Sequence, residues 1–356
     1  MHNLAHSPVI AMTGGRDPKT KFRKVYQEVD DMPAFEPVTK FNATVDDVAR
    51  IPDMVRQAFR VAVSGMPGPV HLQFRGNEGQ IDVEEAELQP LVEPLFAKVP
   101  PFRPEPNSES VLAALKVLQE ASRPVIIAGG GVRASGAGPE LIALAERLAI
   151  PVATSLNGKE CIRGTHPLSV GVVGTYSRGS ANRVVGQADV VCFIGTETGS
   201  MTTNFWVVPK IGVAAVQIDI EPESLGRNYP LKAAVLGDAK VTLARMLTHV
   251  NEASSGRRKA WVEQAQGICR EYRESTPRYW RRTRCRCGRS GYAPTSHGTC
   301  PRMPSWWSTP ATPACGWATC TICAAPARVS CAALGTWAGP FQPASGRRRR
   351  APIGRW

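Results

Sequence analysis

Residues 124–131 read Pro-Val-Ile-Ile-Ala-Gly-Gly-Gly, an apolar run followed at once by three glycines. A short apolar run that ends at a turn signal is typical of a buried strand. A helix pattern over 138–148 follows, and then a second apolar run at 151–154. Strand, glycine loop, helix and strand in this order predict a βαβ unit, and therefore a parallel sheet.

The same alternation continues toward both ends of this unit. Helices are predicted at 108–121, 180–187 and 239–250, and further strands at 189–194, 213–220 and 233–237. Together these segments predict a doubly wound, Rossmann-like α/β domain of five or six parallel strands over residues 108–252. A polar helical connector is expected at 253–280.

A second α/β pattern precedes this domain. A helix expected over 45–63 lies between strand candidates at 8–12 and 69–74, which places part of another α/β domain at residues 1–95. Residues 96–107 are predicted to be a linker, because four prolines within 100–106 resist both helix formation and strand pairing.

The last 76 residues have a different composition. The chain has 356 residues and a formal net charge of +13, yet residues 1–280 carry 31 Lys+Arg against 30 Asp+Glu. Residues 281–356 hold 12 Arg, seven of the ten Cys, no acidic residue and only four of Leu, Ile and Val together. So few aliphatic side chains cannot offset the ordering entropy, and this segment is predicted to be disordered.

Several classes of protein are disfavoured. No apolar run reaches the roughly 20 residues of a membrane span, and no signal peptide pattern opens the chain, so a cytoplasmic location is expected. H-E-x-x-H, P-loop and G-x-S-x-G motifs do not occur. The irregular Cys spacing after residue 281 argues against zinc, and the arginine run at 347–350 is better interpreted as a non-specific charge cluster than as a specific nucleic-acid site.

Two features could approach a nucleotide. Gly129, Gly130 and Gly131 join a strand to a helix, where glycine lets backbone N–H groups come close to a phosphate, although a plain tight turn fits equally well. Asp219 ends a predicted strand, where an acidic group often meets a ribose hydroxyl, but a cap or an exposed strand end is as good an interpretation. Asp238 is expected to be a helix N-cap. His166 is interpreted as a lone loop histidine, and no metal ligand or catalytic residue is assigned.

The chain resembles thiamine diphosphate-dependent enzymes of the acetolactate synthase type. The stretches that resemble the end of the pyrimidine-binding domain are 37–40, 50–59 and 64–70. Those that resemble the central domain follow in order at 124–132, 144–148, 151–154, 158–159, 166–168, 181–182, 188–189, 218–220 and 237–238. It is this ordered set over residues 7–250 that is specific, rather than any single motif.

This resemblance implies a carboligase or decarboxylase that acts on a 2-keto acid with thiamine diphosphate and magnesium, in a homo-oligomer. It also implies that Gln27 and Lys40 lie at the substrate entrance. The glutamate that activates the cofactor and the G-D-G magnesium motif are expected to be missing, which predicts an inactive fragment as encoded. For FAD, which the family can carry, Glu197 stands near the place of a flavin-binding arginine and would repel a diphosphate.

Two alternatives remain open from the sequence. The doubly wound domain could bind a nucleotide or flavin without turnover, or, more weakly, the arginine-rich segment could bind nucleic acid. Residues 281–356 are interpreted as a product of a shifted reading frame, because a shift of two nucleotides permits strings that resemble the start of the family's pyrophosphate-binding domain.

Overall fold

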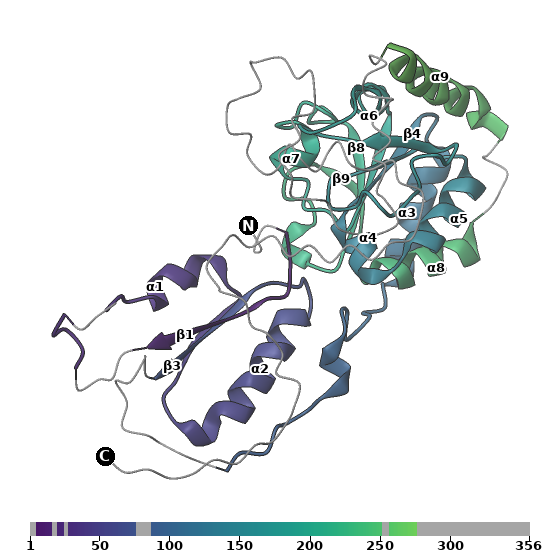
Figure 1. Cartoon of the computed structure of the whole chain (residues 1–356). Coiled ribbons are helices and arrows are strands. Elements are labelled where there is room, and N and C mark those ends of the chain that lie inside the picture. Colours follow the sequence, from purple (N-terminus) through teal and green to yellow (C-terminus); the bar gives the residue numbers. More distant parts are fainter. Residues whose placement is uncertain (1–4, 16–19, 25–27, 76–86, 251–255, 276–356) are drawn as a thin grey trace, which may run out of the picture. The chain divides into compact units, whose positions relative to one another are not determined.

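A computed structural model describes the chain except for residues 1–4, 16–19, 25–27, 76–86, 251–255 and 276–356. The predicted disorder and the proposed frame shift of residues 281–356 therefore lie outside the described residues, as does Gln27. Within the described part the elements form two parallel sheets with their covering helices, one before and one after residue 100 (Figure 1).

The first sheet has three parallel strands in the order β1-β3-β2. Its elements are β1 (Ile10–Gly15), α1 (Met32–Phe35), β2 (Phe41–Val45), α2 (Ile51–Val63) and β3 (Val70–Arg75). The expected helix over 45–63 begins later than predicted, because Val45 ends a strand. The Asp47 side chain then accepts a hydrogen bond from the Ala49 amide (2.8 Å), which starts a 3-10 turn at Val48–Arg50 before Pro52 enters the helix.

The second sheet has six parallel strands in the order β6-β5-β4-β7-β8-β9. Its strands are β4 (Pro124–Ala128), β5 (Val152–Thr154), β6 (Ser169–Val172), β7 (Val190–Ile194), β8 (Ala214–Asp219) and β9 (Leu231–Leu236). Counted along the chain, this order is 3-2-1-4-5-6, the doubly wound order of the Rossmann fold. The predicted α/β fold is confirmed, and its chain order reverses between β4 and β7.

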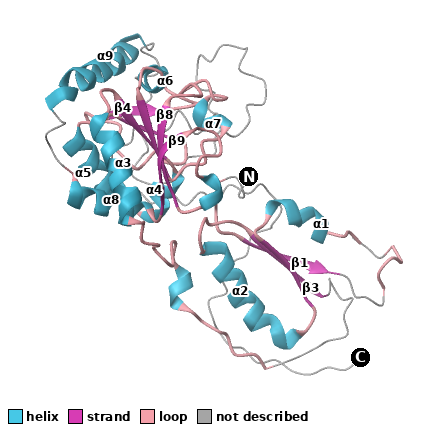
Figure 2. Cartoon of the chain, turned by 180° about the vertical axis from the view of Figure 1, so that it is seen from behind, coloured by secondary structure: helices cyan, strands magenta, loops and turns pink. Residues whose placement is uncertain are grey.

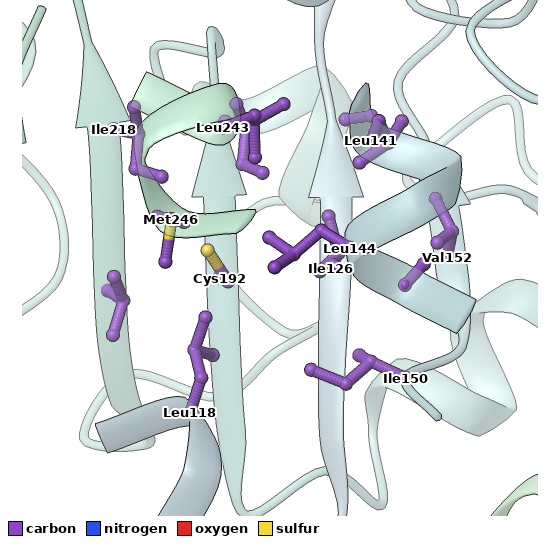
Figure 3. Packing of buried hydrophobic residues seen from close by; sticks show 14 of the residues in the cluster. Leu118, Ile126, Leu141, Leu144, Ile150, Val152, Cys192, Ile218, Leu243 and Met246 are labelled. Atoms are coloured by element: carbon purple, nitrogen blue, oxygen red, sulfur yellow. The ribbon is translucent and has the colours of Figure 1, made fainter. Parts of the chain in front are cut away.

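Helices cover both faces of this sheet (Figures 1 and 2). The helices are α3 (Ser108–Glu120), α4 (Gly130–Ser135), α5 (Gly138–Leu148), α6 (Gly179–Val185), α7 (Ser200–Thr203), α8 (Ala239–His249) and α9 (Lys259–Ser275). One buried cluster joins α3, α5 and α8 to one face of the strands, and a second joins α6 and α9 to the other face. Figure 3 shows the first cluster, where Leu118, Leu144 and Met246 meet side chains of β4, β7 and β8.

Strand β6 was not predicted from the sequence. Ser-Val-Gly-Val at Ser169–Val172 is too short and too small to give a clear apolar pattern. Pairing with β5 and packing beneath α6 and α9 make it a strand, with a register shift opposite Val152 and Ala153. Tertiary packing therefore decides this element.

Helix α9 packs into the second buried cluster, so it is part of this domain as well as the connector that the sequence predicts. Trp261, Ala265, Ile268 and Cys269 are buried in the cluster with α6, and the Trp261 Nε1 donates to the Pro124 carbonyl oxygen at 2.9 Å. Just before α9, the buried Arg258 guanidinium donates to carbonyl oxygens at the ends of α3 and α5, among them those of Ala121 (3.1 Å) and Leu148 (2.7 Å). The positive charge meets the negative ends of two helices, which is the favourable arrangement for the helix dipole.

Candidate functional site at the carboxyl end of the six-stranded sheet

The carboxyl ends of β4, β7 and β8 bring the predicted nucleotide-binding residues to one edge of the sheet. Gly129 follows β4, Gly195 follows β7, and Asp219 is the last residue of β8. In open α/β sheets, ligands bind outside this edge, at the point where the strand order reverses. The fold thus places Gly129–131 at the reversal point and Asp219 one strand farther along the same edge.

The glycines after β4 and β7 pack backbone against backbone. A Cβ atom built on Gly129 would overlap the Gly195 carbonyl oxygen, and one built on Gly131 would lie 2.8 Å from the Gly195 Cα. Gly195 has a φ of +59°, and its own Cβ would lie 2.7 Å from the Gly131 Cα. Glycine is required here because two loops approach each other without room for side chains.

This packing uses two of the backbone donors that a phosphate would need. The Gly129 amide donates to the Ile194 carbonyl oxygen at 2.8 Å, and the Gly131 amide donates to the Gly195 carbonyl oxygen at 3.0 Å. The packing of the two loops against each other is therefore sufficient to explain why residues 129 and 131 are glycines. Their role in cofactor binding stays a prediction.

Asp219 is a buried carboxylate with local hydrogen bonds. Its Oδ1 accepts from the Glu221 amide at 3.1 Å, and its side chain is only slightly exposed. Burial raises the pKa of Asp219 to about 6, while backbone hydrogen bonds from the following residues oppose the shift. A carboxyl group with a pKa near neutrality can hold or release a proton at ordinary pH. Its predicted contact with a ribose stays a prediction.

Glu197 lies in the loop after β7 and carries a negative charge. Its Oε2 lies 3.1 Å from the His6 Nε2, and this hydrogen bond is the main cause of the lowered pKa of Glu197. The neighbouring Thr198 is held by Asn228, whose Nδ2 donates to the Thr198 Oγ1 at 3.0 Å. The loop that the sequence marked as unsuited to a diphosphate therefore presents an ionised carboxylate.

Lys40 caps a helix in the first sheet domain. Its Nζ donates to the carbonyl oxygens of Val61 (2.9 Å), Ser64 (2.8 Å) and Met66 (2.7 Å), at and beyond the end of α2. These contacts use all three ammonium donors, and burial lowers the pKa of Lys40. The structure thus gives Lys40 a capping role, and its place at a substrate entrance stays a prediction. Gln27, the other entrance candidate, lies outside the described residues.

Asp238 is the helix cap that the sequence predicts. Its Oδ1 accepts from the amides of Lys240 and Val241, both at 3.1 Å. The same buried carboxylate accepts from the Arg103 guanidinium (2.9 Å) and the Ser135 hydroxyl (2.8 Å), which ties residues 101–106 to the second domain. The Arg103 and Ser135 contacts were not predicted, because no local pattern joins residues that are about 100 positions apart.

His166, which the sequence places in a loop, has structural partners. The His166 Nε2 lies 3.1 Å from the Glu146 Oε1, and its Nδ1 accepts from the Leu168 amide, so this histidine stabilises a loop.

Burial raises the pKa of the Cys161 thiol to about 11 and that of the Cys192 thiol to about 12. Such thiols stay protonated and are poor nucleophiles at neutral pH.

The described part of the chain offers no group of three or more His, Cys, Asp or Glu side chains that could hold a metal ion. Among the same residues, no helix has both the length and the apolar character that a bilayer crossing requires.

Comparison with known proteins places the second domain in a family. Residues 111–246 match the family model described as the thiamine pyrophosphate enzyme central domain. The probable acetolactate synthase large subunit of Methanocaldococcus jannaschii is 35% identical over 263 residues, which are 72% of this chain and 43% of that protein. The acetolactate synthase large subunit of Corynebacterium glutamicum is 31% identical, over 75% of this chain and 42% of that protein.

A relative with a different name gives a similar match. The glyoxylate carboligase of Escherichia coli O157:H7 is 33% identical over 265 residues, which are 73% of this chain and 44% of that protein. The chain thus spans less than half of the length of the curated relatives that it matches.

Proposed function

This chain belongs to the thiamine pyrophosphate-dependent enzymes of the acetolactate synthase type. We propose that it provides the structural scaffold of an enzyme that carboligates or decarboxylates 2-keto acids. In this proposal residues 108–252 are the central domain and residues 1–95 are the closing part of the pyrimidine-binding domain. Residues 96–107 join the two. The proposed substrate is a small 2-keto acid, and the proposed assembly is a homo-oligomer.

One observation carries the proposal. The similarity extends over 263 aligned residues, which are 72% of this chain, whereas the central-domain family model covers only residues 111–246. A Rossmann-like domain by itself hosts many functions, so fold alone would not support a carboligase. The similarity to acetolactate synthases and to glyoxylate carboligase supports a shared chemistry on 2-keto acids.

Thiamine diphosphate and magnesium are the cofactors of the proposed reaction. Magnesium binds oxygen ligands and bridges to phosphate, usually through one or two carboxylates. The described residues contain no group of three or more His, Cys, Asp or Glu side chains that could hold a metal ion, and we assign no magnesium ligand among them. In this proposal the described residues support the neighbouring loops and take part in no chemical step.

A flavin fits the described residues poorly. The Gly129 and Gly131 amides donate to protein carbonyl oxygens, and Glu197 carries a charge that repels a diphosphate. FAD is therefore left out of the proposed cofactors.

A chimeric enzyme tests the scaffold role. Residues 108–275 of this chain, which include Arg258 and α9, would replace the matching segment of the Corynebacterium glutamicum acetolactate synthase large subunit, with that unaltered subunit as control. We expect the chimera to keep forming acetolactate from pyruvate in the presence of thiamine diphosphate and magnesium. A chimera that has the circular dichroism and assembly state of the control, but no activity, would contradict the proposal.

The full chain is assayed beside the chimera. With thiamine diphosphate and magnesium added, we expect no release of carbon dioxide from pyruvate or glyoxylate, because the described residues offer no metal cluster. Turnover by this chain alone would show that it is more than a scaffold.

A further inference from the structure

A cluster of polar side chains around one buried histidine lies on one face of the three-stranded sheet and is not part of the proposed function. The His71 cluster consists of Thr13 on β1, Asn42 on β2, His71 and Gln73 on β3, and Asp31 just before α1. His71 is fully buried on the central strand, and Asn42 lies directly opposite it in the register of β2 and β3. A buried histidine needs hydrogen-bond partners for both ring nitrogens.

The partners of His71 determine which nitrogen carries the proton. The Asn42 Nδ2 donates to the Met32 carbonyl oxygen (2.7 Å), so the Asn42 Oδ1 faces the His71 Nδ1 at 2.7 Å. The His71 Nδ1 must then be the donor, because an amide oxygen can only accept. The His71 Nε2 accepts from the Thr13 hydroxyl at 2.8 Å. All these contacts are satisfied when the imidazole is neutral.

The same cluster holds residues 31–35 on the sheet. The Phe35 ring stacks on the His71 ring with centroids 3.8 Å apart and planes 7° apart. The Gln73 Nε2 donates to the Asp31 Oδ1, and the Met32 carbonyl oxygen accepts from Asn42. Helix α1 itself has no buried residue. Its docking therefore depends on polar contacts and one ring stack, which puts it among the parts of a fold that open most easily.

We propose that His71 is a proton-operated latch: residues 31–35 stay docked on the sheet while its imidazole is neutral, and they undock when it is protonated. A proton on Nε2 removes the acceptor that the Thr13 hydroxyl uses. It also leaves a cation buried beneath Phe35, which is costly unless an anion pairs with it.

Asp31 is the one charged group that the described residues bring against the ring. Its Oδ2 lies 4.0 Å from the His71 Nε2, while Thr13, Asn42 and Phe35, from the other elements around the ring, are neutral. Asp31 also accepts from Gln73, so a closer pairing with His71 would require residue 31 to move. Protonation is therefore coupled to the position of the segment that starts at Asp31.

The direction of the pH dependence follows from burial. Burial lowers the pKa of His71, and Asp31 opposes this shift without cancelling it. A histidine whose pKa is lower in the docked form binds fewer protons there than in the undocked form. The docking is then complete above the ordinary histidine pKa of about 6.5 and is lost as the pH falls through the lowered value.

Hydrogen exchange of the full chain tests the latch. The amides of Ala34 and Phe35 donate to the Asp31 carbonyl oxygen, both at 3.0 Å, so their protection reports on this turn. After correction for the intrinsic exchange rate, we expect their protection to fall by up to about tenfold for each pH unit between the ordinary histidine pKa of about 6.5 and the lowered pKa of His71. Protection that is constant or that rises between pH 7.5 and 5 would overturn the proposal.

Two variants assign the effect to His71. His71→Asn keeps an amide donor but cannot titrate, and it should remove the pH dependence, whereas the control His249→Asn, at an exposed position that ends α8, should not. If His71→Asn does not fold, Asp31→Asn is decisive, because loss of the opposing anion lowers the docked pKa of His71 further and should make the fall in protection below pH 6.5 larger than in the wild type. A fall no larger than that of the wild type in Asp31→Asn, or loss of the effect in His249→Asn, would contradict the latch.

Discussion

Asp219 shows how burial of a single residue sets a pH dependence. Its ordinary pKa of 3.8 is raised to about 6, mainly by burial, so the folded chain binds a proton there that the unfolded chain has already released. Stability from this group is complete below pH 3.8 and is lost as the pH rises through 6. The ionised side chain thus destabilises the fold at neutral pH.

Asp219→Asn tests this linkage. The amide keeps an oxygen for the Glu221 amide but carries no charge, so the variant should gain stability relative to the wild type as the pH rises from 4 to 7. A shift of about two pKa units corresponds to about 2–3 kcal/mol. The free energy of unfolding is measured by urea titration at each pH. Asp53→Asn, whose wild-type carboxylate is exposed beside Arg50, is the control and should show no such gain.

At the scale of elements, the loops after β4 and β7 form one packed unit. The close approach of Gly131 to Gly195 leaves no space for a Cβ atom on either loop. Gly136 gives a matched comparison, since it has a similar φ of +65° but nothing within 4 Å of an added Cβ. The two positions thus share backbone strain and differ in packing.

Gly195→Ala is expected to destabilise the fold more than Gly136→Ala does. In both variants a side chain on a left-handed backbone lowers the free energy of unfolding by about 1–2 kcal/mol. In Gly195→Ala the forced separation of the two loops lowers it by a further amount of about 1–3 kcal/mol. Urea midpoints and slopes of the two variants and the wild type measure the difference. Equal losses would mean that the two loops can move apart freely.

On the scale of the whole molecule, helix α9 extends the second domain past the residues that match the family model. That match ends at residue 246, whereas the core side chains of α9 include Trp261 and Ile268. The predicted connector at 253–280 thus contains a helix that is held by Arg258 and by apolar packing. The predicted bounds of the domains stay predictions, and the end of α9 at Ser275 is the natural place to test them.

Native trypsin digestion tests where the folded body ends. Residues 281–356 contain 12 arginines, and we expect early cleavage there to leave a resistant product that ends soon after Ser275 and retains α9. Mass spectrometry of the time course identifies the ends of the product. Resistance of residues 281–356 would contradict both their predicted disorder and the frame-shift interpretation. Loss of α9 in the first cuts would contradict its place in the core.

The candidate site was predicted only in part. Gly129–131 and Asp219 could be found because a strand followed by glycine or by an acidic residue is a local signal, and the parallel sheet brings such strand ends to one edge. The alternation of Val70, Leu72 and Phe74 with His71 and Gln73 does signal a strand with one polar face. It does not reveal that Asp31 and Phe35 cover that face.

The amino-acid sequence by itself determined the βαβ order, the doubly wound class and the family resemblance, because apolar periodicity, glycine turns and ordered motifs act over short stretches. Only the tertiary structure decided that β6 is a strand, that Arg258 and α9 belong to the core, that Lys40 caps a helix, and that Phe35 stacks on His71. Each of these depends on groups that are distant in sequence and become neighbours only after folding, where burial sets their pKa values and their partners.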